Sequence, residues 1–165
     1  MANVEFGNME HRIEIPPSTC TGCHRRIELA GIDLWITPHI DNVFVYPSGL
    51  NRDRLKDALG RVLTQWPLVC GRLLLLDGEH YVIEMSDQPI PVTFVDNVDL
   101  KQWPFNSNVV QDTADRQLQP FLDEVQTEKL WYGSLYEPLF RLKVTHLVQT
   151  NEWALGTSWA HVLGD

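Results

Sequence analysis

The last third of the chain carries two neighbouring runs of alternating residues, Leu139-Phe140-Arg141-Leu142-Lys143-Val144-Thr145-His146-Leu147-Val148 and Glu152-Trp153-Ala154-Leu155-Gly156-Thr157-Ser158-Trp159. Alternation of apolar and polar residues with a period of two is typical of a β-strand that has one face on a core. A turn at Thr150-Asn151 separates the runs. The pattern therefore predicts two adjacent antiparallel strands.

Upstream of the hairpin, residues 51–66 predict one amphipathic helix. Their apolar residues recur at spacings of three and four, Asn51 can cap the first turn, and Pro67 stops the pattern. The dipeptide Asp77-Gly78 lies between two apolar runs and predicts a second hairpin.

Shorter runs of β-branched and aromatic residues predict further strands. Residues 43–46 are expected to form a buried strand, and residues 91–95 another. The polar residues 96–119 are expected to form a crossing loop, and residues 120–130 a short helical turn. Together these elements predict an α/β fold, a two-layer sandwich with a mixed, largely antiparallel sheet.

One domain boundary is expected, between residues 26 and 27. Residues 1–26 contain Pro16-Pro17 and no sustained period, and they are expected to be loosely ordered. Residues 27–165 are expected to form the domain itself. Because the chain ends directly after a predicted strand, with no polar tail, a fragment is the favoured interpretation and a short protein the alternative.

Composition excludes several classes of protein. The 165 residues hold 13 Lys plus Arg against 22 Asp plus Glu, a net charge of −9. Such a balance disfavours binding to nucleic acid or to anionic lipid, which needs clustered positive charge. There is neither an apolar run long enough to span a membrane nor an N-terminal export signal. Three cysteines fit a reducing compartment, so a cytoplasmic protein is expected.

The motif His161-Val162-Leu163-Gly164-Asp165 follows the predicted hairpin directly and has the form HxxxD. Alone it is unspecific, because a hydrogen-bonded structural His beside a local carboxylate would have the same sequence. The functional interpretation is a general base at a strand end. A neutral imidazole can accept a proton from a hydroxyl or an amine near neutral pH.

Other segments give this motif a context. The chain resembles the N-terminal half of the BAHD acyltransferases, a family of acyl-CoA-dependent transferases whose signature HxxxD is matched by His161 and Asp165. Residues 65–73 resemble the family's segment after its first helix, which ends in a Gly-Arg-Leu-like triplet. Residues 29–33 resemble its Leu-Ser-x-x-Asp element. The order and spacing of these segments agree over residues 28–165.

The resemblance implies the N-terminal domain of the CoA-dependent acyltransferase (chloramphenicol acetyltransferase-like) fold, in an enzyme of secondary metabolism. His161 would be the catalytic base, and Asp165 would bond to an Arg and position the loop. Acyl-CoA would be a co-substrate, with no tightly bound cofactor and no metal, and the acceptor would be a small molecule with a hydroxyl or an amine. The complete protein would be a monomer with a second, C-terminal domain, so the fragment alone would be inactive.

The sequence departs from the family at several points. Ala30 replaces the Ser of the early element, and the family's second signature, Asp-Phe-Gly-Trp-Gly, has no counterpart. Ala160 precedes His161, whereas related condensation domains of peptide synthetases carry His-His-x-x-x-Asp-Gly, which favours the transferase branch. Two alternatives stay open: a non-catalytic, single-domain binding fragment of the same fold, and a condensation-domain-like relative.

A second motif, Cys20-Thr21-Gly22-Cys23-His24, has the CxxCH form of haem attachment. Haem attachment needs export to an oxidising space, for which no signal is visible. As a zinc site the motif lacks a second ligand pair. The favoured interpretation is a coincidental loop sequence, with a metal or redox contact and haem attachment as alternatives.

The remaining candidates are interpreted as structural. His39 and His146 are expected in the core or on the surface rather than as ligands. Ser158 lacks the Gly-x-Ser-x-Gly elbow of a serine nucleophile. Trp153 and Trp159 are expected to pack in the core, with one of them available to border a substrate channel.

Overall fold

The computed structural model describes residues 9–22, 24–34, 39–47, 49–104, 117–132 and 137–164. Five strands form one sheet in the order β1 (Met9–Ile15), β6 (Ile90–Asn97), β7 (Phe140–Leu147), β8 (Glu152–Ala160) and β3 (His39–Tyr46). A second sheet holds β2 (Arg26–Glu28), β5 (His80–Glu84) and β4 (Arg72–Leu76). The helices are α1 (Gly31–Leu34), α2 (Arg52–Gln65) and α3 (Thr127–Trp131), and the short 3-10 turns are η1 (Pro67–Cys70), η2 (Gln119–Phe121) and η3 (His161–Leu163).

The C-terminal hairpin predicted from the sequence is confirmed. β7 and β8 pair in antiparallel register from Phe140 opposite Trp159 to Leu147 opposite Glu152. β6 and β7 are parallel, and the other pairs are antiparallel, so the sheet is mixed and largely antiparallel, as expected. A parallel pair needs a crossover connection. Here the chain between β6 and β7 supplies it, and within this connection residues 117–132 lie against the sheet.

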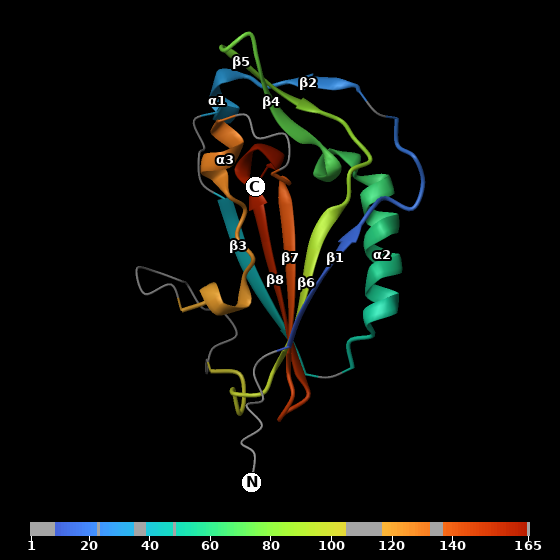
Figure 1. The fold of residues 1–165 in the computed structure, drawn as a ribbon, viewed down its shortest axis with the longest axis vertical. Coiled ribbons are helices and arrows are strands. Elements are labelled where there is room, and N and C mark those ends of the chain that lie inside the picture. Colours follow the sequence, from blue (N-terminus) through green and yellow to red (C-terminus); the bar gives the residue numbers. More distant parts are fainter. Residues whose placement is uncertain are drawn as a thin grey trace.

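The long helix α2 covers one face of the larger sheet (Figure 1). The side chain of Asn51 accepts a hydrogen bond from the backbone N–H of Arg54, which caps the helix as predicted. The apolar side of α2 completes a core with residues from η1, β1, β6, β7 and β8. The buried members are Ile15, Leu63, Val69, Cys70, Ile90, Val92, Phe94, Leu142, Val144 and Trp153. Among the described residues, no helix is both long and apolar enough to cross a membrane.

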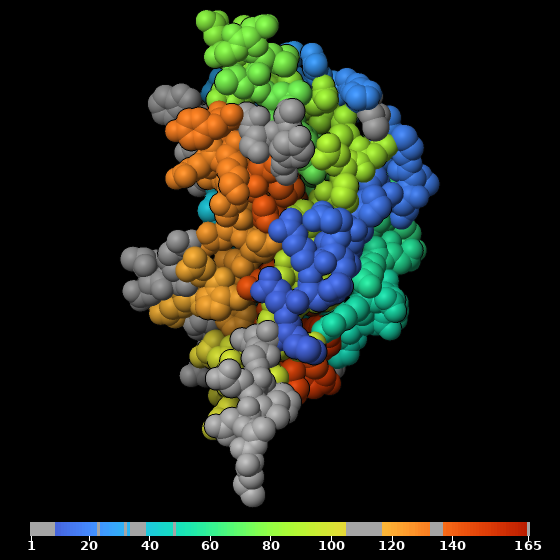
Figure 2. Space-filling model, in the orientation of Figure 1, coloured from blue at the N-terminus to red at the C-terminus, as the bar shows by residue number. Residues whose placement is uncertain are grey.

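The crossing segment, residues 117–132, covers the opposite face of the sheet. Figure 2 shows it in orange along one side of the molecule, with α2 on the other side. Its apolar residues pack beneath the second sheet in a core cluster of Leu73, Ile83, Val125, Leu130, Leu139 and Ala160. The predicted short helical turn is confirmed as η2 and α3.

The second hairpin is also confirmed at Asp77-Gly78. The register pairs Leu76 with His80, which leaves Asp77, Gly78 and Glu79 in the turn. Asp77 has φ 51° and Gly78 has φ 74°, so both are left-handed, a conformation that Gly favours and Asp tolerates.

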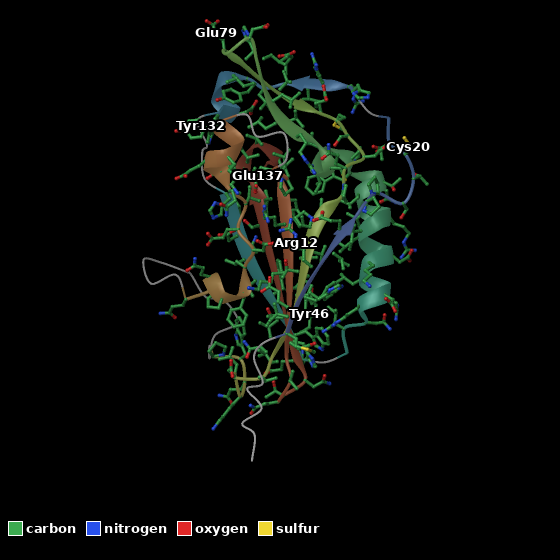
Figure 3. All side chains as sticks on the ribbon, viewed as in Figure 1. Arg12, Cys20, Tyr46, Glu79, Tyr132 and Glu137 are labelled. Carbon is green, nitrogen blue, oxygen red and sulfur yellow. The ribbon has the colours of Figure 1, made fainter. Side chains whose placement is uncertain are left out.

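Two expectations from the sequence are wrong. Residues 43–46 lie in an edge strand, because β3 pairs only with β8 among the described residues, and Phe44, Val45 and Tyr46 are 50%, 37% and 44% exposed. Figure 3 labels Tyr46 near the narrow end of the sheet. Within residues 1–26, expected to be loosely ordered, Met9–Ile15 forms β1, whose mostly exposed polar side chains hide the strand pattern.

Gly156 of β8 lies directly against the backbone of the crossing segment at Phe121. A Cβ atom at this position would overlap the backbone carbonyl oxygen of Phe121. Gly156→Ala is therefore expected to destabilise the fold by at least about 2 kcal/mol, measured by urea unfolding. Gly31→Ala is the control, because a Cβ there meets no heavy atom within 4 Å. Equal stability of the two variants would contradict the packing described.

Candidate functional site

His161 lies where β8 leaves the sheet and enters the turn η3. The backbone N–H of Ala160 donates to the carbonyl of Leu139 at 2.8 Å, which holds the end of β8 on β7. The N–H of Gly164 donates to the carbonyl of His161 at 2.9 Å and closes the turn. The His161 side chain is half-buried. The predicted base is therefore fixed at the end of a sheet strand, where it is partly open to solvent.

The turn that carries His161 is supported from both sides. The indole Nε1 of Trp159 donates to the carbonyl oxygen of Gly164 at 3.1 Å, across the turn. Gly164 has φ 110°, a conformation that favours glycine. Val162 and Leu163 pack against the core clusters. Trp159 is half-buried, and its hydrogen bond stabilises the turn. The sequence pattern alone did not reveal this bracing role of Trp159.

The structure brings the early Leu29–Asp33 element to the same place. Helix α1 lies against η3 (Figure 1). The carboxylate of Asp33 accepts a hydrogen bond from the N–H of Ala30 at 2.8 Å and stabilises the start of α1. Asp165 lies outside the described residues, so its expected pairing with an Arg stays a prediction.

The Gly71-Arg72-Leu73 triplet lies at the start of β4, in the second sheet, and has a structural role. The guanidinium of Arg72 is buried and donates to the carbonyl oxygens of Cys70, Gly71 and Pro89. Burial lowers the pKa of Arg72 from its ordinary value. This motif supports the loop between η1 and β4 rather than a reacting group.

A polar row crosses the face of the sheet beneath the crossing segment. Arg141 of β7, Ser158 of β8 and Asp41 of β3 are neighbours in register. Arg141 is 8% exposed and donates to Glu137, which is 4% exposed, at 2.9 Å. Its other terminal nitrogen donates to Asp123 at 3.3 Å.

Ser158 connects the crossing segment to the edge strand. Its hydroxyl oxygen accepts a hydrogen bond from the N–H of Val125 at 3.0 Å and donates to the carboxylate of Asp41. Burial raises the pKa of Asp41, the hydrogen bond from Ser158 and the charge of His39 act in the opposite direction, and the charge of Glu124 raises it further.

His39, Asp41 and Glu124 come together at the end of this row. The Nε2 of His39 lies 3.1 Å from Oδ2 of Asp41, and one ligand atom from each of the three residues lies within 4.8 Å of the others. The sequence interpretation of His39 as a structural residue did not find this cluster. The spacing His39-x-Asp41 places both on one face of a strand and was an available signal, whereas Glu124 lies in a segment without a clear pattern.

His146 lies at the far end of the sheet in a separate network. Its Nδ1 is 3.1 Å from Oδ1 of Asp96, its Nε2 is 3.1 Å from Oδ1 of Asn151, and its ring stacks on Trp153 at 4.2 Å. Arg52 of α2 donates to the same Asp96 oxygen. These contacts join α2 to the hairpin, and Trp153 is buried as expected.

In the CxxCH motif, Cys20 and Thr21 fasten their loop to the chain after β5. The thiol of Cys20 donates to Oδ2 of Asp87 at 2.8 Å, and the N–H of Thr21 donates to Oδ1 of the same residue at 3.0 Å. Cys23 lies outside the described residues. The contacts of Cys20 favour the interpretation as a loop sequence.

Comparisons with known proteins identify the fold. The sequence matches no protein-family model and no curated protein. Among solved structures, vinorine synthase superposes with a TM-score of 0.66 at 17% identity over 94% of this chain. The starter condensation domain of the rhizomide synthetase gives a TM-score of 0.54 at 11% identity over 86% of the chain. A nonribosomal peptide synthetase gives 0.56 at 18% identity over 92%.

The chain therefore has the fold of the N-terminal domain of the CoA-dependent acyltransferases, as the resemblance implied. This is an acyltransferase-type fold that vinorine synthase and condensation domains share. The chain spans 38% of vinorine synthase, 33% of the condensation domain structure and 14% of the peptide synthetase.

The brace on the His161 turn can be tested with Trp159→Phe, which keeps an aromatic ring but removes the indole N–H. The hydrogen bond to Gly164 is then lost, and the amide of Gly164 is expected to exchange with solvent at least about tenfold faster, with about 1 kcal/mol lost in stability. Trp66→Phe is the control, because Trp66, directly after α2, is 51% exposed. Unchanged exchange at Gly164, measured by NMR, would contradict the bracing role.

The two described cysteines are expected to differ sharply in reactivity. Burial raises the pKa of Cys70 to about 11, and its side chain is fully buried, whereas Cys20 is exposed. With that pKa, only about one Cys70 side chain in a thousand is ionised at pH 8. The thiolate is the reactive form of cysteine. Iodoacetamide should therefore label Cys20 and spare Cys70 in the folded protein, as read by peptide mass spectrometry. Comparable labelling of both residues would contradict this burial.

Proposed function

We propose that the chain is the N-terminal part of an enzyme that transfers an acyl group from acyl-CoA to a hydroxyl or amine acceptor, with His161 as general base. The observation that carries the proposal is the placement of His161 at the exit of β8, on a braced turn, in an acyltransferase-type fold. A base in this position has a rigid support on one side and solvent access on the other.

In the proposed reaction, the imidazole of His161 takes the proton of the acceptor while its oxygen or nitrogen attacks the thioester carbonyl. The tetrahedral intermediate then collapses, the bond to sulfur breaks, and the CoA thiolate takes the proton from the imidazolium. No acyl-enzyme is needed, because the thioester is already activated. Donors for the developing oxyanion would be required, and the proposal places them in the C-terminal domain.

Several further parts of the proposal concern the complete protein. A C-terminal domain would complete the channel for acyl-CoA and for a small-molecule acceptor. Asp165 would pair with an Arg and position the loop rather than transfer protons. The complete enzyme would be a cytoplasmic monomer of secondary metabolism without a tightly bound cofactor, and residues 1–165 alone would be inactive.

A condensation-type enzyme is the second candidate, because condensation domains are among the structural neighbours. Such an enzyme would take its acyl group from a carrier-protein thioester instead of CoA. The residue before His161 is Ala160, which favours the CoA-dependent branch. Turnover with acyl-CoA but not with acyl carrier protein supports the first candidate, and the reverse supports the second.

General-base assistance is worth about 100- to 10,000-fold in rate. In the complete two-domain protein, His161→Ala is expected to lower kcat by that range and to leave acyl-CoA affinity largely intact, because the imidazole acts on the acceptor's proton. The measurement is steady-state transfer from a panel of acyl-CoAs to hydroxyl and amine acceptors.

The matched control for this experiment is His80→Ala, on the exposed end of β5 in the second sheet. Its activity is expected to equal that of the wild type. If His161→Ala turns over within a few-fold of the wild type at saturating acceptor, the catalytic assignment fails. The non-catalytic binding fragment then becomes the better interpretation.

A further inference from the structure

The cluster of His39, Asp41 and Glu124 contains three side chains of the kinds that bind metal ions. His39 and Asp41 are two residues apart on β3 and therefore project from the same face of the sheet. Glu124 reaches the same place from the crossing segment. One imidazole nitrogen and two carboxylate oxygens can approach one another to within 4.8 Å without any change of backbone.

Two atoms of the cluster lack a partner. The Nδ1 of His39 and the Oδ1 of Asp41 are inaccessible to solvent and have no hydrogen-bond partner. Polar atoms removed from water normally find a partner, because leaving one unpaired costs free energy. The cluster thus holds unused coordination capacity on two of its three residues, and a cation bound between them would use it.

The backbone around the cluster is already fixed by neighbouring contacts. On one side of Glu124, the carboxylate of Asp123 is bound by Arg141, and on the other side the N–H of Val125 is bound by Ser158. Ser158 also donates to Asp41. Metal sites typically have such outer hydrogen bonds, which orient the ligating side chains.

We propose that His39, Asp41 and Glu124 bind one divalent transition-metal ion of the zinc type, which staples the edge strand β3 to the crossing segment. A neutral imidazole and two carboxylates carry a charge of −2, which matches the ion. Imidazole nitrogen together with carboxylate oxygen is a zinc donor set, whereas magnesium and calcium prefer oxygen alone.

Zinc with three protein ligands keeps a fourth position for water. Ligand atoms in a tetrahedral zinc site lie about 3.3 Å apart, so binding requires side-chain shifts of about 1 Å in this cluster. The proposal does not depend on acyl transfer, and it differs from the expectation from the sequence that the chain has no metal site.

The test uses residues 1–165 with Cys20 and Cys23 replaced by Ser, so that thiol ligands do not compete. After treatment with a chelator, zinc is titrated by calorimetry, and cobalt is added as a spectroscopic substitute. We expect one ion per chain with a Kd of about 1 µM or tighter. A hundredfold excess of zinc over Kd should raise Tm by about 5 °C.

Asp41→Asn and Glu124→Gln keep the shapes of the side chains and remove one ligand charge each. Each is expected to weaken zinc binding at least about tenfold and, at the same zinc concentration, to reduce the rise in Tm by about half or more. The double variant Glu79→Gln with His80→Ala is the matched control, because it removes a carboxylate and an imidazole from the β4–β5 hairpin. Its zinc affinity should equal that of the parent.

The outcomes decide the proposal in either direction. Absence of zinc binding by the folded parent overturns it, and so does binding that survives both Asp41→Asn and Glu124→Gln. An equal loss of zinc affinity in the control variant also overturns it, because the zinc then binds to exposed side chains rather than to this cluster. If the two site variants fail to fold, as judged by circular dichroism, a zinc-dependent rise in the parent's Tm supports the staple and its absence overturns it.

Discussion

The arrangement of the sheet and its crossing segment depends on the ion pairs that the buried guanidinium of Arg141 forms with Glu137 and Asp123. The guanidinium lies between Glu137 and Asp123, so one charge on β7 joins the chain before the strand to the segment that crosses the sheet. Removing one member of a buried ion pair typically costs about 3–5 kcal/mol, because the remaining charge is left without compensation. Glu137 also accepts the N–H of Gln126, which places a second backbone contact in the same network.

The position of the candidate base follows from this network. With the segment held on the sheet, Val125 and Leu130 pack against Leu139 and Ala160 at the end of β8. That end is where the chain turns into η3 and presents His161. The same segment places Glu124 beside β3, so the candidate catalytic turn and the candidate metal cluster rest on one set of contacts. Gly156 permits both, since any larger residue would lift η2 from the sheet.

The sequence predicted those parts of the fold that depend on local pattern. The β7–β8 hairpin, α2 with its Asn51 cap, and the turn at Asp77-Gly78 all have short-range signals that the structure confirms. The edge strands were less predictable. Burial of residues 43–46 was inferred from their apolar character, but exposure in an edge strand is set by which neighbours the strand has. In β1 the polar exposed side chains conceal a strand that the register with β6 defines.

The candidate site also contains one part that the sequence predicted and one part that only the tertiary structure brings together. His161 was found from the HxxxD motif and its resemblance, and its position after β8 follows from the hairpin. The polar row of Arg141, Ser158 and Asp41 joins three strands that are distant in the chain, so no window of sequence contains it. Glu124 joins this row only through the crossing segment, whose path depends on tertiary contacts rather than on local preference.

Native-state hydrogen exchange measured by NMR tests most directly whether the crossing segment is an integral part of the sheet structure. The N–H groups of Val125 and Gln126 bond to Ser158 and Glu137, whereas that of Ala160 bonds to Leu139 within the sheet structure. If Arg141 holds the segment as described, all three amides should exchange through the same global opening, with the same dependence on denaturant. Exchange of Val125 and Gln126 that is about a hundredfold or more faster than that of Ala160 would contradict the account, because the segment would then open independently of the sheet.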